Sequence, residues 1–153
     1  MKYSDIKIFV IEDDISIRSL IRRIIEKNFQ IIVNEFGSPV GAFKAMGSVI
    51  PDLIILDIHT PHISGFAAMQ TIAANERLKN IPVVACTGDS SPAIIKQLIH
   101  LGVKEYILKP FDLQDLTERL EFLLDEILEK KANEPESEKH NSLSIGFKEN
   151  KYV

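Results

Sequence analysis

The chain has 153 residues, 45% hydrophobic and 26% charged, which suits one globular domain with a buried core. Its net charge of -4 argues against direct binding to nucleic acid, because such surfaces are basic. The apolar runs are strand-sized, shorter than the roughly 18 residues of a membrane helix, and the first residues lack a signal-peptide pattern. We therefore expect a cytoplasmic protein that binds neither nucleic acid nor membrane.

The single cysteine, Cys86, excludes an internal disulfide and a cysteine-based metal cluster. Three apolar residues precede it, so a buried thiol is expected. A reducing compartment is compatible with this cysteine content.

Apolar runs predict five strands, at residues 6–11, 30–36, 53–56, 81–86 and 105–109. Four of these runs are nearly continuous in apolar residues, which is typical of parallel strands covered on both faces. Amphipathic segments between and after them predict helices. The first helix is expected to bury Ile17, Leu20, Ile21 and Ile24 and to carry Arg18, Arg22, Arg23 and Glu26 on its polar side.

Polar residues mark the ends of these helices. Ser38-Pro39 and Ser91-Pro92 are each typical of an N-cap followed by proline in the first turn. Three more caps are expected at Asp14, Ser64 and Asp112, and Gly102 is expected to stop the fourth helix.

The alternation of strands and helices predicts an α/β fold, a doubly wound (βα)5 parallel sheet. The domain is expected to span residues 1–130. After Lys131 the charges are mixed and the periodicity is lost, so residues 131–153 are predicted to be a disordered tail or linker.

Acidic residues follow two of the predicted strands. Glu12 and Asp13 come directly after the first strand, and Asp57 comes after the third. With strand order 2-1-3-4-5, these three carboxylates meet at the crevice where the strand order reverses. Carboxylates that crowd together repel unless a cation neutralises them, and oxygen ligands favour Mg²⁺.

The fourth and fifth strands also end in polar residues, Thr87-Gly88-Asp89 and Lys109-Pro110. Any one of these residues is more often a turn residue or a helix cap than part of a site. Polar residues of this kind at the ends of four predicted strands together favour a functional site.

Residues 5 to 130 resemble the receiver domain of two-component response regulators, such as stand-alone chemotaxis regulators. Four segments carry the resemblance, in the family's order and spacing: FVIEDD, LDIHTPHISG, ACTG and EYILKPF. The resemblance implies a flavodoxin-like sheet with strand order 2-1-3-4-5.

The resemblance also implies a role for each residue of the site. Asp57 would accept a phosphoryl group from a sensor histidine kinase or a phosphotransfer protein. Asp13, Asp57 and the backbone carbonyl of His59 would bind Mg²⁺ directly, and Glu12 would hold it through water. Lys109 would pair with Asp57 and then with the phosphoryl group, and a cis peptide bond at the following proline would orient the lysine.

The family's switch would use Thr87 and Tyr106. The phosphoryl group would draw in the Thr87 hydroxyl, Tyr106 would turn inward, and a partner-binding face would repack. That face would recruit an output protein or domain that the sequence does not name, and phosphorylation-dependent dimerisation is an open alternative. Such a domain is a signalling module that catalyses only its own phosphotransfer and dephosphorylation, and His59 and Asp89 would tune its phosphoryl lifetime.

Two other interpretations remain open. A metal-dependent hydrolase could bind zinc through Asp57, His59 and His62, although Lys109 would then have no clear role. A receiver-like interaction module that is never phosphorylated is the second alternative, and the intact acceptor, metal and switch residues argue against it.

Overall fold

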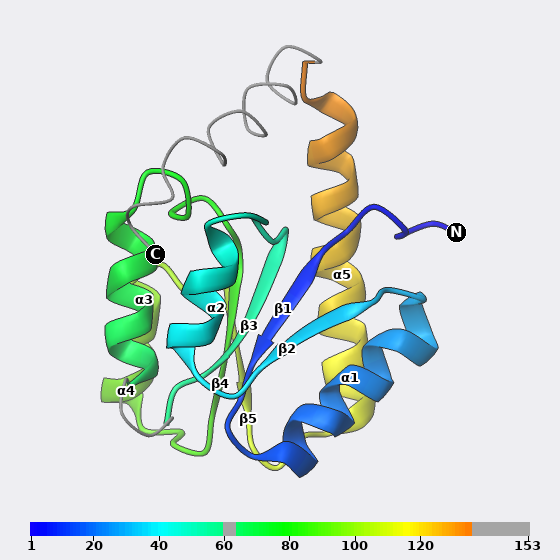
Figure 1. The fold of residues 1–153 in the computed structure, drawn as a ribbon. Helices are drawn as coiled ribbons and strands as arrows, with labels where there is room; N and C mark the ends of the chain where they lie inside the picture. The colour runs from blue at the N-terminus through cyan, green and yellow to red at the C-terminus, as the bar shows by residue number, and fades with distance from the viewer. Residues whose placement is uncertain (60–63, 136–153) are drawn as a thin grey trace.

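The computed structural model of the protein describes residues 1–59 and 64–135. In this part of the chain five strands alternate with five helices (Figure 1). The elements are β1 (Ile8–Ile11), α1 (Ile15–Phe29), β2 (Val33–Phe36), α2 (Pro39–Met46), β3 (Leu53–Asp57), α3 (Gly65–Ala74), β4 (Val83–Thr87), α4 (Pro92–His100), β5 (Glu105–Leu108) and α5 (Leu113–Asn133). The strands form one parallel sheet in the order β2-β1-β3-β4-β5, so the predicted fold and strand order are confirmed.

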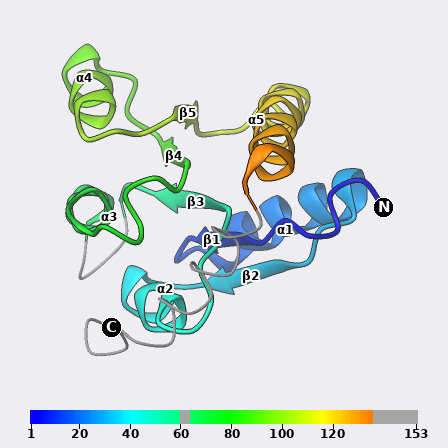
Figure 2. The same cartoon turned by 90° about the horizontal axis from the view of Figure 1, so that it is seen from above.

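Helices cover both faces of the sheet. Figures 1 and 2 show α1 and α5 on one face and α2, α3 and α4 on the other. Successive strand side chains alternate between the faces, so Ile8 and Val10 pack with α1 and α5, whereas Phe9 and Ile11 pack on the other side. Burial on both sides explains why β1 is apolar at every position, and β3 and β4 at every position before their last residue.

The largest difference from the expected elements lies at the start of the second strand. Helix α1 continues to Phe29, and Gln30 then takes a left-handed conformation with φ of 54°. The strand therefore begins at Val33 and not at residue 30. β1 similarly begins two residues later than expected, at Ile8.

The predicted helix ends are mostly confirmed. The side chains of Asp14, Ser64, Ser91 and Asp112 each accept a hydrogen bond from a main-chain N–H of the first turn. Ser38 precedes Pro39 as expected, but its side chain makes no capping hydrogen bond.

The fourth helix ends where the sequence indicates. Gly102 follows it with a positive φ of 97°, a conformation that favours glycine.

The fifth helix extends through Asn133, into the segment expected to be a tail. Residues 136–153 lie outside the described part of the chain. None of the described helices combines the length and apolar character that a membrane span requires.

Cys86 is buried within the core on the α1 and α5 face, as predicted. Burial raises the pKa of its thiol to about 12, so the thiol is held in its unreactive protonated form.

Candidate functional site

Two buried carboxylates lie side by side at the carboxyl ends of the central strands. β1 pairs with β3 in a register that places Ile11 beside Leu56, so the next residues, Glu12 and Asp57, are neighbours. Glu12 is 2% exposed and Asp57 is 4% exposed. Carboxylate oxygens of Glu12, Asp57 and the exposed Asp13 all lie within 4.8 Å of one another, so the predicted acidic group is assembled.

A lysine from the edge of the sheet reaches this group. Lys109 follows β5, and its Nζ lies 3.2 Å from Asp57 Oδ1 and 2.5 Å from Glu12 Oε1. The Lys109–Pro110 peptide bond is cis. The expected pair with Asp57 is present, and the shorter contact with Glu12 is an addition that the sequence did not indicate.

The two buried carboxylates differ in acidity. Burial and the neighbouring Asp57 raise the pKa of Glu12 to about 8, although Lys109 acts in the opposite direction. Burial also acts to raise the pKa of Asp57, but contacts with Glu12, the His59 N–H and Lys109 outweigh it and lower that pKa. In the metal-free protein Asp57 is therefore the carboxylate that stays ionised, as a nucleophile must.

The chemistry of this group fits a divalent cation. Glu12 Oε2 is buried and has no hydrogen-bond partner among the described residues. Asp57 Oδ1 accepts a hydrogen bond of 3.1 Å from the His59 N–H. Mg²⁺ prefers oxygen ligands and takes only a few of them from the protein, which matches the carboxylates of Glu12, Asp13 and Asp57. A bound ion would also satisfy the unpaired Glu12 Oε2.

The second side of the site is formed by the end of β4. Thr87 is fully buried, and its Oγ1 accepts a hydrogen bond of 3.0 Å from the Asp89 N–H. The same oxygen lies 3.5 Å from His59 Nε2. His59 and Asp89 thus both contact the predicted switch threonine.

Tyr106 lies on the neighbouring strand, on the same face of the sheet as Thr87. In the β4–β5 register Ala85 pairs with Tyr106 and Thr87 pairs with Leu108. Tyr106 is partly buried against the core on the α2, α3 and α4 face, to which Ala85 also belongs. Thr87 is two residues beyond Ala85, so its side chain points to that same face.

Gly65 was not singled out by the sequence, although it ends the LDIHTPHISG segment. Its N–H donates a 2.9 Å hydrogen bond to the Ile58 carbonyl. A Cβ atom at this position would lie 2.4 Å from Ile58 Cα and 2.6 Å from the Asp57 carbonyl oxygen. Only glycine allows α3 to begin this close to Asp57.

Arg18 was expected on the polar side of its helix and is instead mostly buried, with 20% of its side chain exposed. Its Nη1 donates a 2.9 Å hydrogen bond to the Glu12 carbonyl, and its Nε lies 3.5 Å from Glu35 Oε1. The Glu12 N–H donates to the Phe36 carbonyl at 3.0 Å. Both main-chain groups of Glu12 are therefore held in place.

The hydrolase interpretation depends on two histidines. Within residues 1–59 and 64–135, the group of potential metal ligands consists of Glu12, Asp13 and Asp57, and His59 is not part of it. His62 lies outside the described residues.

Comparisons with known proteins agree with this geometry. Residues 8–121 match the family model for the response regulator receiver domain. The chemotaxis protein CheY of Listeria monocytogenes is 28% identical over 116 residues, covering 76% of this chain and 96% of that protein. The CAI-1 autoinducer sensor kinase/phosphatase CqsS of Vibrio cholerae is 33% identical over 108 residues, which is 69% of this chain but only 16% of the kinase.

Solved structures share the fold. The signal receiver domain of a DNA-binding response regulator from Colwellia psychrerythraea superposes with a TM-score of 0.74 at 24% identity, covering 79% of this chain and 99% of that domain. The receiver domain of a sensor histidine kinase from Pseudomonas aeruginosa, with a magnesium ion coordinated in its active-site cleft, has a TM-score of 0.69 at 21% identity. That match covers 78% of this chain and 97% of the kinase's receiver domain. The chain belongs to the receiver-domain family of two-component response regulators.

Proposed function

We propose that this receiver domain takes a phosphoryl group onto Asp57 from a histidine kinase or a phosphotransfer protein, in a reaction that depends on Mg²⁺. The observation that carries the proposal is the position of Asp57. It is a buried, ionised carboxylate at a strand end, in contact with Lys109 and adjacent to two further acids.

In the proposed transfer, an Asp57 oxygen forms a bond to phosphorus while the bond from phosphorus to the donor histidine nitrogen breaks. A carboxylate is a weak nucleophile, so the site must act mainly by positioning and by neutralising charge. Lys109, whose Nζ lies 3.2 Å from Asp57 Oδ1, would contact a phosphoryl oxygen once Asp57 is modified. Asp13, Asp57 and the His59 carbonyl would bind Mg²⁺ directly and Glu12 through water, and the bound ion would neutralise charge on the transferred group.

The output of the domain follows from the same residues. The phosphoryl group would draw in the Thr87 hydroxyl, and Tyr106 would turn inward and change the face formed by α4, β5 and α5. An output protein or domain would read that face, and phosphorylation-dependent dimerisation is a second route to output. One relative, of which this chain covers 96%, is a chemotaxis protein, and another is a much longer sensor kinase. These two relatives support the proposal both for a free receiver domain and for one that is joined to a kinase.

We propose a cytoplasmic location, which the buried free thiol of Cys86 suits.

Intact-mass measurement tests the acceptor directly. Incubation with acetyl phosphate and Mg²⁺ should add one phosphoryl group to the wild type, and Asp57→Asn should abolish the addition. Asp5→Asn, a change at an exposed aspartate away from the site, is the matched control and should label normally. Full labelling of Asp57→Asn would place the acceptor elsewhere, and tightly bound zinc in the purified protein would favour the hydrolase.

A further inference from the structure

Strand β5 lies at one edge of the described sheet, and its pairing partner among residues 1–59 and 64–135 is β4. The Lys109 N–H donates a 2.8 Å hydrogen bond to the Thr87 carbonyl. Main-chain groups alternate between the two sides of a strand, so Glu105 and Ile107 face β4 as Lys109 does. The N–H and C=O of Tyr106 therefore point to the open edge, where no strand of the described part of the chain pairs with them.

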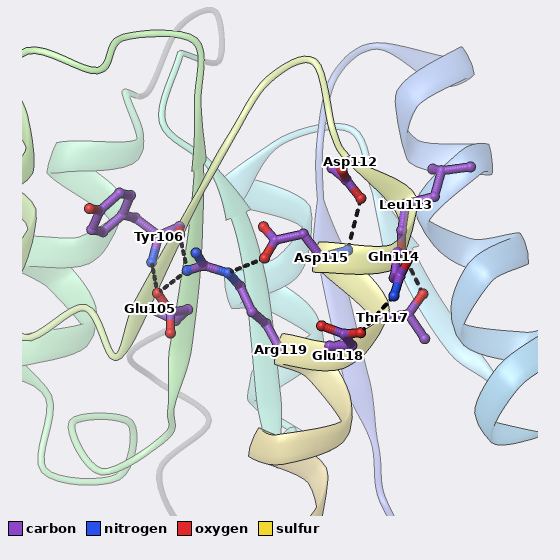
Figure 3. A network of polar contacts seen from close by, with 9 residues as sticks. All are labelled: Glu105, Tyr106, Asp112, Leu113, Gln114, Asp115, Thr117, Glu118 and Arg119. Atoms are coloured by element: carbon purple, nitrogen blue, oxygen red, sulfur yellow. Dashed lines mark hydrogen bonds and ion pairs between the residues drawn. The ribbon is translucent and has the colours of Figure 1, made fainter.

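Side chains occupy this open edge at Tyr106. Glu105 Oε1 accepts a 3.2 Å hydrogen bond from the Tyr106 N–H. Arg119 Nη1 donates to the Tyr106 carbonyl at 3.3 Å and to Glu105 Oε1 at 2.6 Å. Asp115 Oδ1 accepts a 3.0 Å hydrogen bond from Arg119 Nε, which holds the guanidinium on α5 (Figure 3).

The tyrosine ring lies on the opposite side of the strand from these contacts. Figure 3 shows the Tyr106 ring directed away from Arg119. The ring packs against the core on the α2, α3 and α4 face, whereas Glu105 and Arg119 meet on the α5 side. The main chain of Tyr106 is thus held from one side, and its ring packs on the other.

We propose that Arg119 and Glu105 form a clamp on the Tyr106 main chain and that Arg119 is a positioning residue of the switch. A ring turns about its own bonds only while its Cα atom stays in place, and an edge strand that is paired on one side can shift instead of letting the ring turn. The clamp keeps β5 in place, so phosphorylation of Asp57 is expressed as ring movement and not as displacement of the strand. This inference rests on the proposed function.

The first test needs no phosphoryl group. Hydrogen exchange, measured residue by residue in the unmodified protein, should be faster at the Tyr106 amide in Arg119→Gln than in the wild type. The Ile107 amide, which faces β4, should be unchanged. Arg22→Gln is the matched control, because Arg22 has similar exposure and joins α1 to β2 through Glu35, far from β5. An unchanged Tyr106 amide in Arg119→Gln would overturn the clamp.

The second test follows the ring. The three tyrosines are replaced by fluorotyrosine, and the Tyr106 signal is assigned by its loss in Tyr106→Phe. Beryllofluoride with Mg²⁺ serves as the phosphoryl mimic, and its own ¹⁹F signal reports occupancy of Asp57. In Arg119→Gln, and in Glu105→Gln as a second variant, the beryllofluoride signal should persist while most of the Tyr106 shift is lost.

The two signals separate the clamp from the proposed function. A full Tyr106 response in both variants, with beryllofluoride bound, would overturn the clamp and leave the acceptor assignment intact. Absence of a bound beryllofluoride signal in the wild type would overturn the proposed function, and the clamp's role in switching with it. Arg22→Gln should respond as the wild type does, and an equal loss there would also overturn the clamp.

Discussion

The ammonium group of Lys109 lies closer to Glu12 than to Asp57, at 2.5 Å against 3.2 Å. The lysine therefore bridges two buried carboxylates of the site. Its charge stabilises the ionised Asp57 carboxylate and also acts to lower the pKa of Glu12.

Replacing Lys109 separates folding from switching. We expect Lys109→Ala to fold, because β5 and its core contacts are unchanged, but to lose most of the Tyr106 response to beryllofluoride. Lys109→Arg should rescue poorly, because a planar guanidinium does not reproduce a compact ammonium between two carboxylates. Circular dichroism checks folding and the fluorotyrosine signal checks switching. Full switching in Lys109→Arg would contradict this prediction.

The Glu12 carboxyl predicts a pH dependence of stability in the metal-free protein. Its pKa is raised from 4.5 to about 8, so the folded state binds more protons than the unfolded state between these values. The free energy of unfolding should therefore fall as pH rises from about 5 to 8, by at most about 1.4 kcal/mol per pH unit. The pKa of Asp57 is lowered, so this group has the opposite effect on stability. Its stabilising contribution is lost only as the pH falls below 3.8, the usual pKa of an aspartate.

Urea unfolding in the presence of a chelator checks this sign. Glu12→Gln removes the titrating group, so its stability should decline less over the same pH range. Identical pH dependence in Glu12→Gln and the wild type would show that another group controls the decline.

Two glycines near the site give a paired prediction about backbone packing. Gly65→Ala forces a Cβ into the main chain of Asp57 and Ile58, so it should lower the free energy of unfolding by about 1–3 kcal/mol and weaken Mg²⁺ binding. Gly88→Ala is the control, because a Cβ there meets no atom within 4 Å and φ is not positive. Denaturant unfolding and Mg²⁺ titration measure both effects. Equal behaviour of the two variants would show that the loop after Asp57 adapts.

The acidic group was predictable because parallel strands end at one edge of the sheet. Once the apolar runs around residues 6–11 and 53–56 are recognised as neighbouring strands, Glu12 and Asp57 must approach each other. The contact of Lys109 with Glu12 was not predictable, because it depends on how far a flexible side chain reaches across β4.

Other features were missed because sequence periodicity describes one element at a time. Arg18 occupies a polar position of α1, yet β2 and the end of β1 close around it and bury most of the side chain. The contact between Glu105 and Arg119 joins β5 to α5 and exists only after the helix docks on the sheet. The start of β2 was misplaced because Gln30 adopts a left-handed conformation that its residue type does not demand.

The tail remains a prediction from composition. Deleting the residues after Asn133 should change the melting temperature little, because that segment has few apolar residues with which to pack. Thermal unfolding of the truncated and full-length chains measures the effect. A large drop on truncation would show that Phe147 or Tyr152 packs against the domain.

Thr87 and Tyr106 are expected to act as one switch, separable from phosphoryl acceptance. Thr87→Ala leaves the carboxylates and Lys109 in place, so Asp57 should still be phosphorylated. The variant loses one hydrogen bond to a charged acceptor, worth about 1.5–3 kcal/mol, which is enough to shift a two-state balance more than tenfold. Tyr106→Ala should likewise accept the phosphoryl group and respond poorly at the output face.

The double variant decides whether the two residues are coupled. Their side chains lie on the same face of adjacent strands, so one movement can involve both. If they act together, Thr87→Ala with Tyr106→Ala should be no worse than the more damaged single variant, because the second change removes nothing further. The measurement is affinity for a phosphorylation-dependent partner, or for a second copy of the chain, with and without beryllofluoride across the four proteins. Strictly additive losses would mean that Thr87 and Tyr106 respond independently, and the switch assignment would fail while Asp57 could remain the acceptor.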